Sequence, residues 1–372
     1  MGPLRASPWR RRPPRATPST KMTSRRSCKS CKPRCPRFRA RPPERTMRKP
    51  MPETNPYSQY NTNTQALLSH EAMIYMGWYD AAVALYAFAA AVFIGYWFFR
   101  NRYVLGAALT LTVAGLVSQG LSLGLRWQYN PGHHIPWNDL YGSLSVVSFW
   151  AIVMFLWFGA RLKIWFAGPL VLAFTDGLLA YAKGWNKGLE PLVPSLQSPF
   201  LFIHVPIVLA SYAAFLIGFA TSILYLLKRW DEDRIARIAG QSVGAAVAVR
   251  GEGAALGRPG YLSWLEMVPA AAKLDVISYR VIAVGEILLT AGIMLGGLWA
   301  HLAWGSYWQW DPKETAALAS WAIYASYLHL HTRPSWRGVR AAWWSIAGFL
   351  SILFCYFGIN IWVASQSLHS YR

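Results

Sequence analysis

The feature that most constrains this chain is a series of apolar segments, each long enough to cross a bilayer as a helix. A hydrocarbon core roughly 30 Å thick needs about 20 helical residues. The 372 residues are 54% hydrophobic and include 20 tryptophans, too apolar a composition for an ordinary soluble domain. We therefore predict an all-α fold, a polytopic transmembrane helical bundle with about eight spans. They fall near residues 80–99, 104–125, 142–160, 164–182, 201–227, 280–300, 312–331 and 341–363.

The third and fourth segments are short or interrupted, by Gly168, Pro169 and Asp176, so a count of seven stays open. Lys and Arg residues in the connectors set the orientation, because positively charged loops stay in the cytoplasm. The basic connectors alternate with others that hold few positive charges, and we expect the latter to face outward. The basic ones contain Arg100 and Arg102, Arg161 and Lys163, the run 228–237, and the run 333–340.

The N-terminal segment carries most of the positive charge. Of the formal net charge of +21, residues 1–50 contribute 17 Lys or Arg against the single acid Glu44. Because the segment is rich in Pro and Ser and has little to bury, we predict a disordered extension over residues 1–72, not a nucleic-acid-binding domain. The alternation of the connectors places the N-terminus on the outer side, where the positive-inside rule disfavours so many Lys and Arg residues. We therefore expect that translation starts downstream or that this segment is a processed targeting segment. Residues 73–372 form the predicted transmembrane domain.

Three of the four cysteines, Cys28, Cys31 and Cys35, lie in this extension with a spacing that suggests zinc. A fourth ligand and a surrounding fold are missing there, so we do not assign a zinc site. Cys355 lies in an apolar segment and is most simply a buried thiol. The sequence contains no C-x-x-C-H, so the chain is not itself a c-type cytochrome.

The segment WGSYWQWDPKET combines aromatic residues with a helix N-terminus. It spans residues 304–315 and overlaps the predicted outer loop at residues 301–313. Asp311 and Glu314 flank a proline at the positions of a capping box, so a helix should begin here. Three tryptophans precede it and offer flat faces to a large planar ligand. The alternative is an ordinary aromatic belt that anchors helix ends in the interface. The tryptophans are Trp304, Trp308 and Trp310.

The eight histidines provide candidate haem-iron ligands, since haem commonly takes axial His and an intramembrane His is costly. His204 opens one span at its outer end, and His369 follows the last span on the same side. His329 lies 18 residues past Asp311, roughly 27 Å deeper at 1.5 Å per residue. One haem cannot reach all three, so we predict two stations. Taken alone, His204 could simply hydrogen-bond a backbone carbonyl, and His369 could be a solvated residue.

The segment WGSYWQWDPKET, followed by WAIYASYLH, resembles the tryptophan-rich (WWD) signature of the CcsA/ResC family of cytochrome c maturation. The resemblance covers residues 80–371, and the DPKET and LHSY segments favour CcsA over related WWD families. It also rests on segments in the same order, namely PLVPSLQSPFLFIHV, LDVISYR, GLWAHLAWG, SWRGVRAA and SLHSY.

The resemblance implies a haem-binding subunit of the cytochrome c synthetase complex. Such a subunit delivers haem b, its substrate, to the outer face and positions it for thioether attachment, as part of a holocytochrome c synthase. Axial ligands would be His204 and His369 at the outer station and His329 at the inner one. Trp304, Trp308, Trp310 and Asp311 would contact the macrocycle, and no residue is assigned as catalytic. His134 resembles part of a GHxP segment, and His301 has no motif position.

The partners implied are a ResB-type membrane subunit, which supplies a second His to the inner station, an apocytochrome c with its CxxCH motif, thiol-reducing proteins and membrane lipid. No nucleic acid is expected. The location is the bacterial plasma membrane, with the thylakoid as the alternative, and the active site faces outward. Two rival functions are a haem transporter without attachment activity and a structural subunit.

The sequence departs from the family pattern at three positions. Gly142 replaces a Glu, Glu286 replaces an aromatic residue, and Ala316 replaces a Trp. These changes concern helix packing and the first outer loop. They leave the three candidate histidines and the candidate tryptophans untouched.

Overall fold

The computed structural model describes residues 62–130, 133–186, 188–189, 198–248, 265 and 268–362, and they contain helices but no strand. The all-α prediction is therefore confirmed. The helices are α1 (Thr62–Phe99), α2 (Arg102–Tyr129), α3 (Leu140–Leu162), η1 (Trp165–Ala167), α4 (Gly168–Lys183), α5 (Leu201–Ala248), α6 (Ala271–Trp304), α7 (Pro312–His331), η4 (Pro334–Trp336), α8 (Val339–Leu353), η5 (Phe354–Gly358) and α9 (Ile359–Trp362).

The first helix begins earlier than predicted. The chain divides into residues 1–57, which lie outside the described ranges, and 58–372, which hold the helices of the described residues. Helix α1 starts at Thr62, so the expected boundary between residues 72 and 73 falls inside it. The last proline before α1 is Pro56, and nothing in the following segment breaks a helix. The candidate cysteines of the extension lie outside the described residues.

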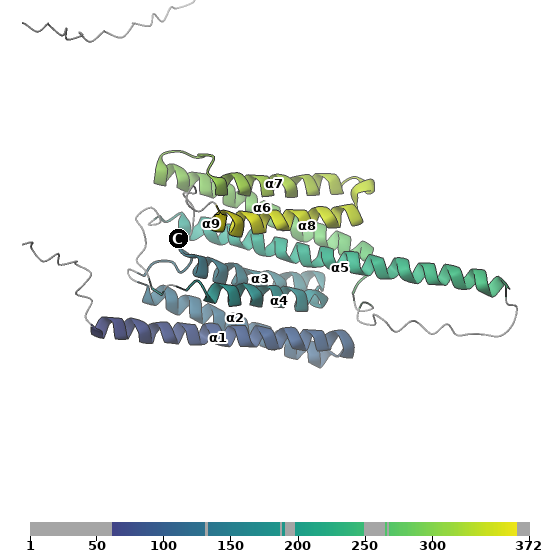
Figure 1. Ribbon diagram of the computed structural model, residues 1–372, viewed down its shortest axis with the longest axis horizontal. Helices are drawn as coiled ribbons and strands as arrows, with labels where there is room; N and C mark the ends of the chain where they lie inside the picture. The colour runs from purple at the N-terminus through teal and green to yellow at the C-terminus, as the bar shows by residue number, and fades with distance from the viewer. Residues whose placement is uncertain are drawn as a thin grey trace, which may run out of the picture. The chain divides into compact units, whose positions relative to one another are not determined.

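The chain is an integral multi-pass membrane protein, and seven of its described helices are long and apolar enough to cross a membrane. The prediction of eight is wrong by one. The helix that falls short is α7, which forms at the predicted residues but carries Lys313, Glu314, His329 and His331. Those residues, with its serines and tyrosines, lower its hydropathy below that of the others. Helix α7 nevertheless runs beside α6 and α8 (Figure 1).

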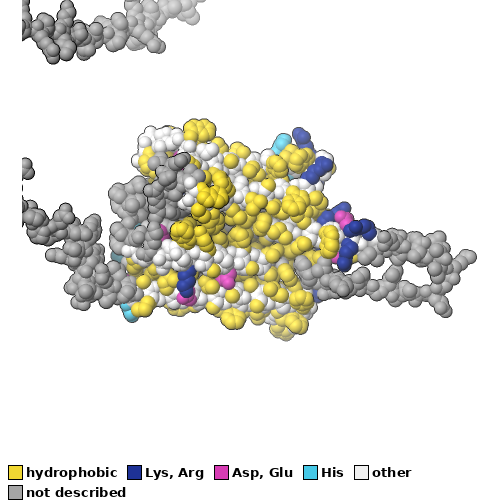
Figure 2. Space-filling view, viewed as in Figure 1, with side chains coloured by type: hydrophobic (Ala, Val, Ile, Leu, Met, Phe, Trp, Pro, Cys, Tyr) yellow, Lys and Arg dark blue, Asp and Glu magenta, His cyan; other side chains and the backbone are white. Residues whose placement is uncertain are grey.

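Successive long helices run in alternating directions, so the bundle has two distinct ends (Figure 1). At the end that we call the tryptophan end, α1, α3, α5 and α7 begin and α2, α4 and α6 finish. At the opposite end, which we call the basic end, lie the connectors that are rich in Lys and Arg. Figure 2 shows Lys and Arg side chains gathered there, on α5 and around the turn between α7 and α8.

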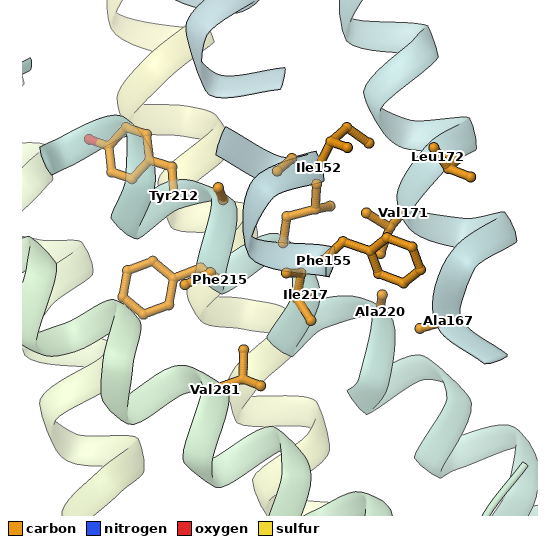
Figure 3. Close-up of a cluster of buried hydrophobic side chains, with 14 of the residues drawn as sticks. Ile152, Phe155, Ala167, Val171, Leu172, Tyr212, Phe215, Ile217, Ala220 and Val281 are labelled. Carbon is orange, nitrogen blue, oxygen red and sulfur yellow. The ribbon is translucent and has the colours of Figure 1, made fainter. Parts of the chain in front are cut away.

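Helix α5 lies at the centre of the bundle and packs against α3, α6 and α8. Buried side chains from α3, α4, α5 and α6 meet around it, among them Phe155, Phe215 and Val281 (Figure 3). Close packing holds helices together in lipid, where burial of apolar surface offers little advantage over the acyl chains. Gly285 of α6 allows such an approach, because a Cβ there would lie 2.8 Å from the ring of Phe215. That ring stacks on Tyr324 of α7 with centroids 3.8 Å apart.

Two of the departures from the family pattern have structural counterparts. At Gly142 an added Cβ would overlap the carbonyl oxygen of Pro136, so the loop 133–139 before α3 lies directly on this glycine. Glu286 is buried in α6, and neither of its carboxylate oxygens has a hydrogen-bond partner among the described residues. Ala316 lies in the first turns of α7 and is half-buried.

Candidate functional site

The loop between α6 and α7, residues 305–311, is held by the predicted capping box. The Asp311 carboxylate accepts a hydrogen bond from the amide of Lys313 at 2.8 Å, and the Glu314 carboxylate reaches back to the capping residue. Glu314 also accepts a hydrogen bond from the amide of Gln309 at 2.9 Å. The capping prediction is confirmed. Glu314 therefore fixes the loop as well as the helix start.

The two loop tryptophans present different surfaces. Trp308 is half-buried and Trp310 is 71% exposed, and their rings meet at 5.9 Å with an interplanar angle of 88°. Trp310 has a φ of 57°, in the left-handed region that bulky residues rarely adopt. Its backbone turns there so that the next residue can cap α7. Together they offer an exposed aromatic surface at the tryptophan end.

His204 lies in the first turn of α5, half-buried against α6. Its Nδ1 lies 2.8 Å from the carbonyl oxygen of Gly292. The imidazole stacks on the indole of Trp299, with centroids 6.1 Å apart and an interplanar angle of 21°. Trp299 in turn meets Trp304 edge to face at 4.8 Å. His204 and Trp304, which the sequence proposed as parts of one site, therefore belong to one ring cluster joined by Trp299.

Sequence reasoning missed Trp299. It is almost fully buried, and its contact with the imidazole of His204 forms only when α5 and α6 are packed together. The available signal was its place in GLWAHLAWG, one of the segments that carry the family resemblance.

A second group of aromatic residues extends the cluster toward α2. Trp127, Trp137 and Phe202 approach one another with ring centroids 5.9 to 6.3 Å apart. Ile135 from the loop 133–139 packs with Trp299 and Leu201 in one buried cluster. The aromatic surface thus extends from the end of α2 across α5 to the end of α6.

Arg126 anchors the loop 133–139 to the bundle. Its guanidinium donates a hydrogen bond to the carboxylate of Asp139 at 2.7 Å and lies over the ring of Tyr141 at 4.3 Å. The Arg126 side chain is only 3% exposed. Asp139 also accepts a hydrogen bond from the amide of Gly142 and so caps α3. A single buried ion pair therefore ties α2 to the loop and to the next helix.

Among the described residues, the other candidate iron ligand, His329, lies apart from His204. His329 is exposed at the other end of α7, near the basic end, as the 18-residue spacing predicted. His369 lies outside the described residues. His331, two residues after His329, is buried: its Nε2 lies 3.1 Å from the Asp275 carboxylate, and its ring stacks on Tyr279 at 4.7 Å. Of the candidate ligands in the described residues, His204 alone meets the aromatic cluster.

The other histidines have local contacts. His134 is buried, with its Nδ1 3.3 Å from the Asn130 side-chain nitrogen, and His301 is exposed and stacks on Tyr307 at 4.2 Å. His133 and His70 are exposed. Within the described residues, no group of three or more His, Cys, Asp or Glu side chains is arranged to hold a metal ion.

Lys313 at the start of α7 and Cys355 in η5 connect these two segments of the chain. The Lys313 ammonium lies 3.5 Å from the Asn360 side-chain oxygen and 5.9 Å from the centre of the Tyr356 ring, so it turns into the bundle. Cys355 is buried and its sulfur lies 3.8 Å from the carbonyl oxygen of Lys313, which confirms the packed thiol that the sequence predicted. Lys313 therefore does not extend its ammonium group to the membrane interface, as a snorkelling lysine would.

Replacing Glu314 with Ala is expected to loosen the loop 305–311, because two backbone amides lose their carboxylate acceptor. Hydrogen exchange followed by mass spectrometry should show faster exchange in peptides covering 305–311. Thr315→Ala, an exposed neighbour that makes no such contact to the loop, is the control. Equal exchange in the Glu314 variant and in the unmodified protein would contradict the assignment of Glu314 to the loop.

Fold and site together define a multi-pass helical membrane protein with an aromatic and histidine-bearing surface at one end of its bundle. A family model described as cytochrome C assembly protein matches residues 137–367, more than half of the chain. The chain belongs to this family, which confirms the resemblance seen in the sequence.

Named relatives agree. The chain is 37% identical over 261 residues to the cytochrome c biogenesis protein CcsA of Synechococcus sp. (strain RCC307), covering 68% of this chain and 80% of that protein. It is 35% identical over 263 residues to CcsA of Mesostigma viride, covering 68% and 81%. The solved structure of the cytochrome c heme lyase CcmF matches with a TM-score of 0.52 and 17% identity, over 77% of this chain and 46% of that chain. At this identity the match shows the fold alone.

Proposed function

We propose that the chain is the haem-binding membrane subunit of a cytochrome c synthetase, and that it positions haem b for thioether attachment to apocytochrome c. The observation that carries the proposal is the contact chain from His204 through Trp299 to Trp304. It combines an imidazole, which suits haem iron, with flat apolar faces, which suit the macrocycle. The names of the relatives, cytochrome c biogenesis protein CcsA, support a role in this process.

At the outer station, His204 and His369 serve as axial ligands, and Trp304, Trp308 and Trp310 support the ring. Asp311 contributes by fixing the backbone between the last tryptophan and α7. Thioether formation joins haem vinyl groups to the two cysteine thiols of a CxxCH motif, and it depends on proximity and orientation more than on a catalytic acid. The protein's contribution is to hold the vinyl edge toward the outside. The His of the apocytochrome then displaces one axial ligand.

At the inner station, His329 receives haem before its passage outward. The exposed position of His329 on α7 leaves room for a second histidine from a ResB-type partner subunit. The basic end, to which His329 is close, faces the cytoplasm under the positive-inside rule, and the tryptophan end faces outward. The membrane is the bacterial plasma membrane or the thylakoid.

Co-expression with a ResB-type partner and a CxxCH apocytochrome tests the proposal. Covalent haem should appear on the apocytochrome in haem-stained denaturing gels, and only when thiols are kept reduced. An apocytochrome with both motif cysteines replaced by serine is the control. Haem bound to this chain without covalent product would favour the rival haem transporter, and a purified complex without a Soret band would favour a structural subunit.

A further inference from the structure

One turn of α6 forms the binding surface for the imidazole of His204. The carbonyl oxygen of Gly292 lies 2.8 Å from Nδ1. One turn later, Gly296 has no Cβ, and an added one would lie 2.6 Å from Cε1, 3.1 Å from Nδ1 and 3.3 Å from Nε2 of His204. Real Cβ atoms essentially never come within 3.0 Å of another group. The imidazole can therefore occupy this position only beside a glycine.

The glycine at 292 brings the two helices together. A Cβ there would lie 2.5 Å from Cγ2 of Val208, which is one turn after His204 on α5. Gly292 thus lets the α5 backbone approach α6, and Gly296 accommodates the ring. Two glycines one turn apart on α6 match two residues one turn apart on α5, as in other close helix contacts in membranes.

The contact with Gly292 also selects a tautomer. A backbone carbonyl oxygen only accepts hydrogen bonds, so Nδ1 must carry the proton in this contact. A neutral imidazole carries a single N–H, and Nε2 is then the nitrogen with the lone pair. Metal-binding histidines are commonly oriented in this way, with one ring nitrogen donating to a backbone carbonyl and the other directed to the metal.

We propose that Gly296 and the carbonyl of Gly292 are positioning elements that present Nε2 of His204 to haem iron. The inference rests on the proposed function of the outer station and adds the coordinating nitrogen and the residues that orient it. The stacked indole of Trp299 fixes the plane of the ring from another side.

The tautomer can be measured without haem. In protein labelled with ¹⁵N-histidine, the His204 resonances, assigned by their loss in His204→Gln, should show a protonated Nδ1 and an unprotonated Nε2. Gly296→Ala should shift these resonances, whereas Gly124→Ala, a helical glycine with nothing within 4 Å of an added Cβ, should leave them unchanged. A protonated Nε2 in the unmodified protein would overturn the proposal, even if the Gly296 variant fails to fold.

Haem binding gives an independent readout. Second-sphere changes of this kind lower metal affinity by about 10- to 100-fold, so we expect a loss of that order in Gly296→Ala, with the low-spin spectrum weakened and restored by added imidazole. In a His204→Ala background, Gly296→Ala should have no further effect. An additional loss there would show that Gly296 acts through packing alone and would overturn the proposal. If His204→Ala itself retains haem normally, the proposed outer station fails while the tautomer measurement stands.

Discussion

Replacing His204 with alanine is expected to abolish haem binding at the proposed outer station, and with it the proposed covalent product. The variant removes the imidazole that joins α5 to the ring cluster and leaves the tryptophans in place. Because the aromatic faces alone provide no ligand to iron, haem should bind weakly and in the wrong orientation for its vinyl groups. The measurements are the Soret and α-band spectra of the purified protein and the yield of haem-stained cytochrome.

His301→Ala is the matched control for this experiment. His301 lies at the same end of the bundle, one residue after a buried alanine in α6, but it is exposed and its ring stacks on Tyr307. It should keep the spectrum and the yield of the unmodified protein. Unchanged spectra and yield in His204→Ala would contradict the role of His204, and equal losses in both variants would indicate a general effect of changing this surface.

Replacing Arg126 with methionine is expected to cost about 3–5 kcal/mol of stability, because breaking a buried pair leaves the other charge uncompensated. Arg126 is 3% exposed and its partner Asp139 is 18% exposed. Methionine retains much of the arginine stem but neither the hydrogen bond to Asp139 nor the stacking on Tyr141. Thermal unfolding in detergent, followed by intrinsic tryptophan fluorescence, measures the change.

The control is Lys183→Met, which removes an ion pair of the same length on the surface. Lys183 and Asp80 are 2.7 Å apart and each is 51% exposed. Exposed pairs contribute about 0–1 kcal/mol. Similar destabilisation by the two variants would contradict the anchoring role of Arg126. If Arg126→Met destabilises the protein and Lys183→Met does not, Arg126→Met should also disturb the loop 133–139, because Asp139 lies between that loop and α3.

The features predicted correctly from the sequence are those set by local signals. Apolar runs predicted the helices, and the Asp311 to Glu314 spacing predicted the start of α7 at the residue where it begins. The span count was wrong because α7, with its polar and charged residues, is less apolar than the other long helices, although it packs alongside them. The local sequence thus predicts where a helix begins and how apolar it is, but not which helices pack against it.

The rest of the site depends on contacts between distant parts of the chain. His204 and Gly292 are 88 residues apart, and no periodicity within α5 or α6 indicates which glycine faces which side chain. The same holds for Asp275 and His331, which are 56 residues apart. Sequence reasoning therefore identified His204 as a candidate through a motif, but the nitrogen it presents and the residues that hold it required the packed helices.

The bare backbone at Gly142 has a practical consequence for comparing relatives. Because the carbonyl of Pro136 occupies the space that a side chain would need, this loop cannot keep its path in any protein that carries glutamate at the equivalent position. Coordinates for residues 133–139 should therefore not be copied between such relatives and this chain. Ile135 and Trp137 of that loop pack beside Trp299, so the shape of the surface proposed to face haem should differ between such relatives and this chain even where every histidine is shared.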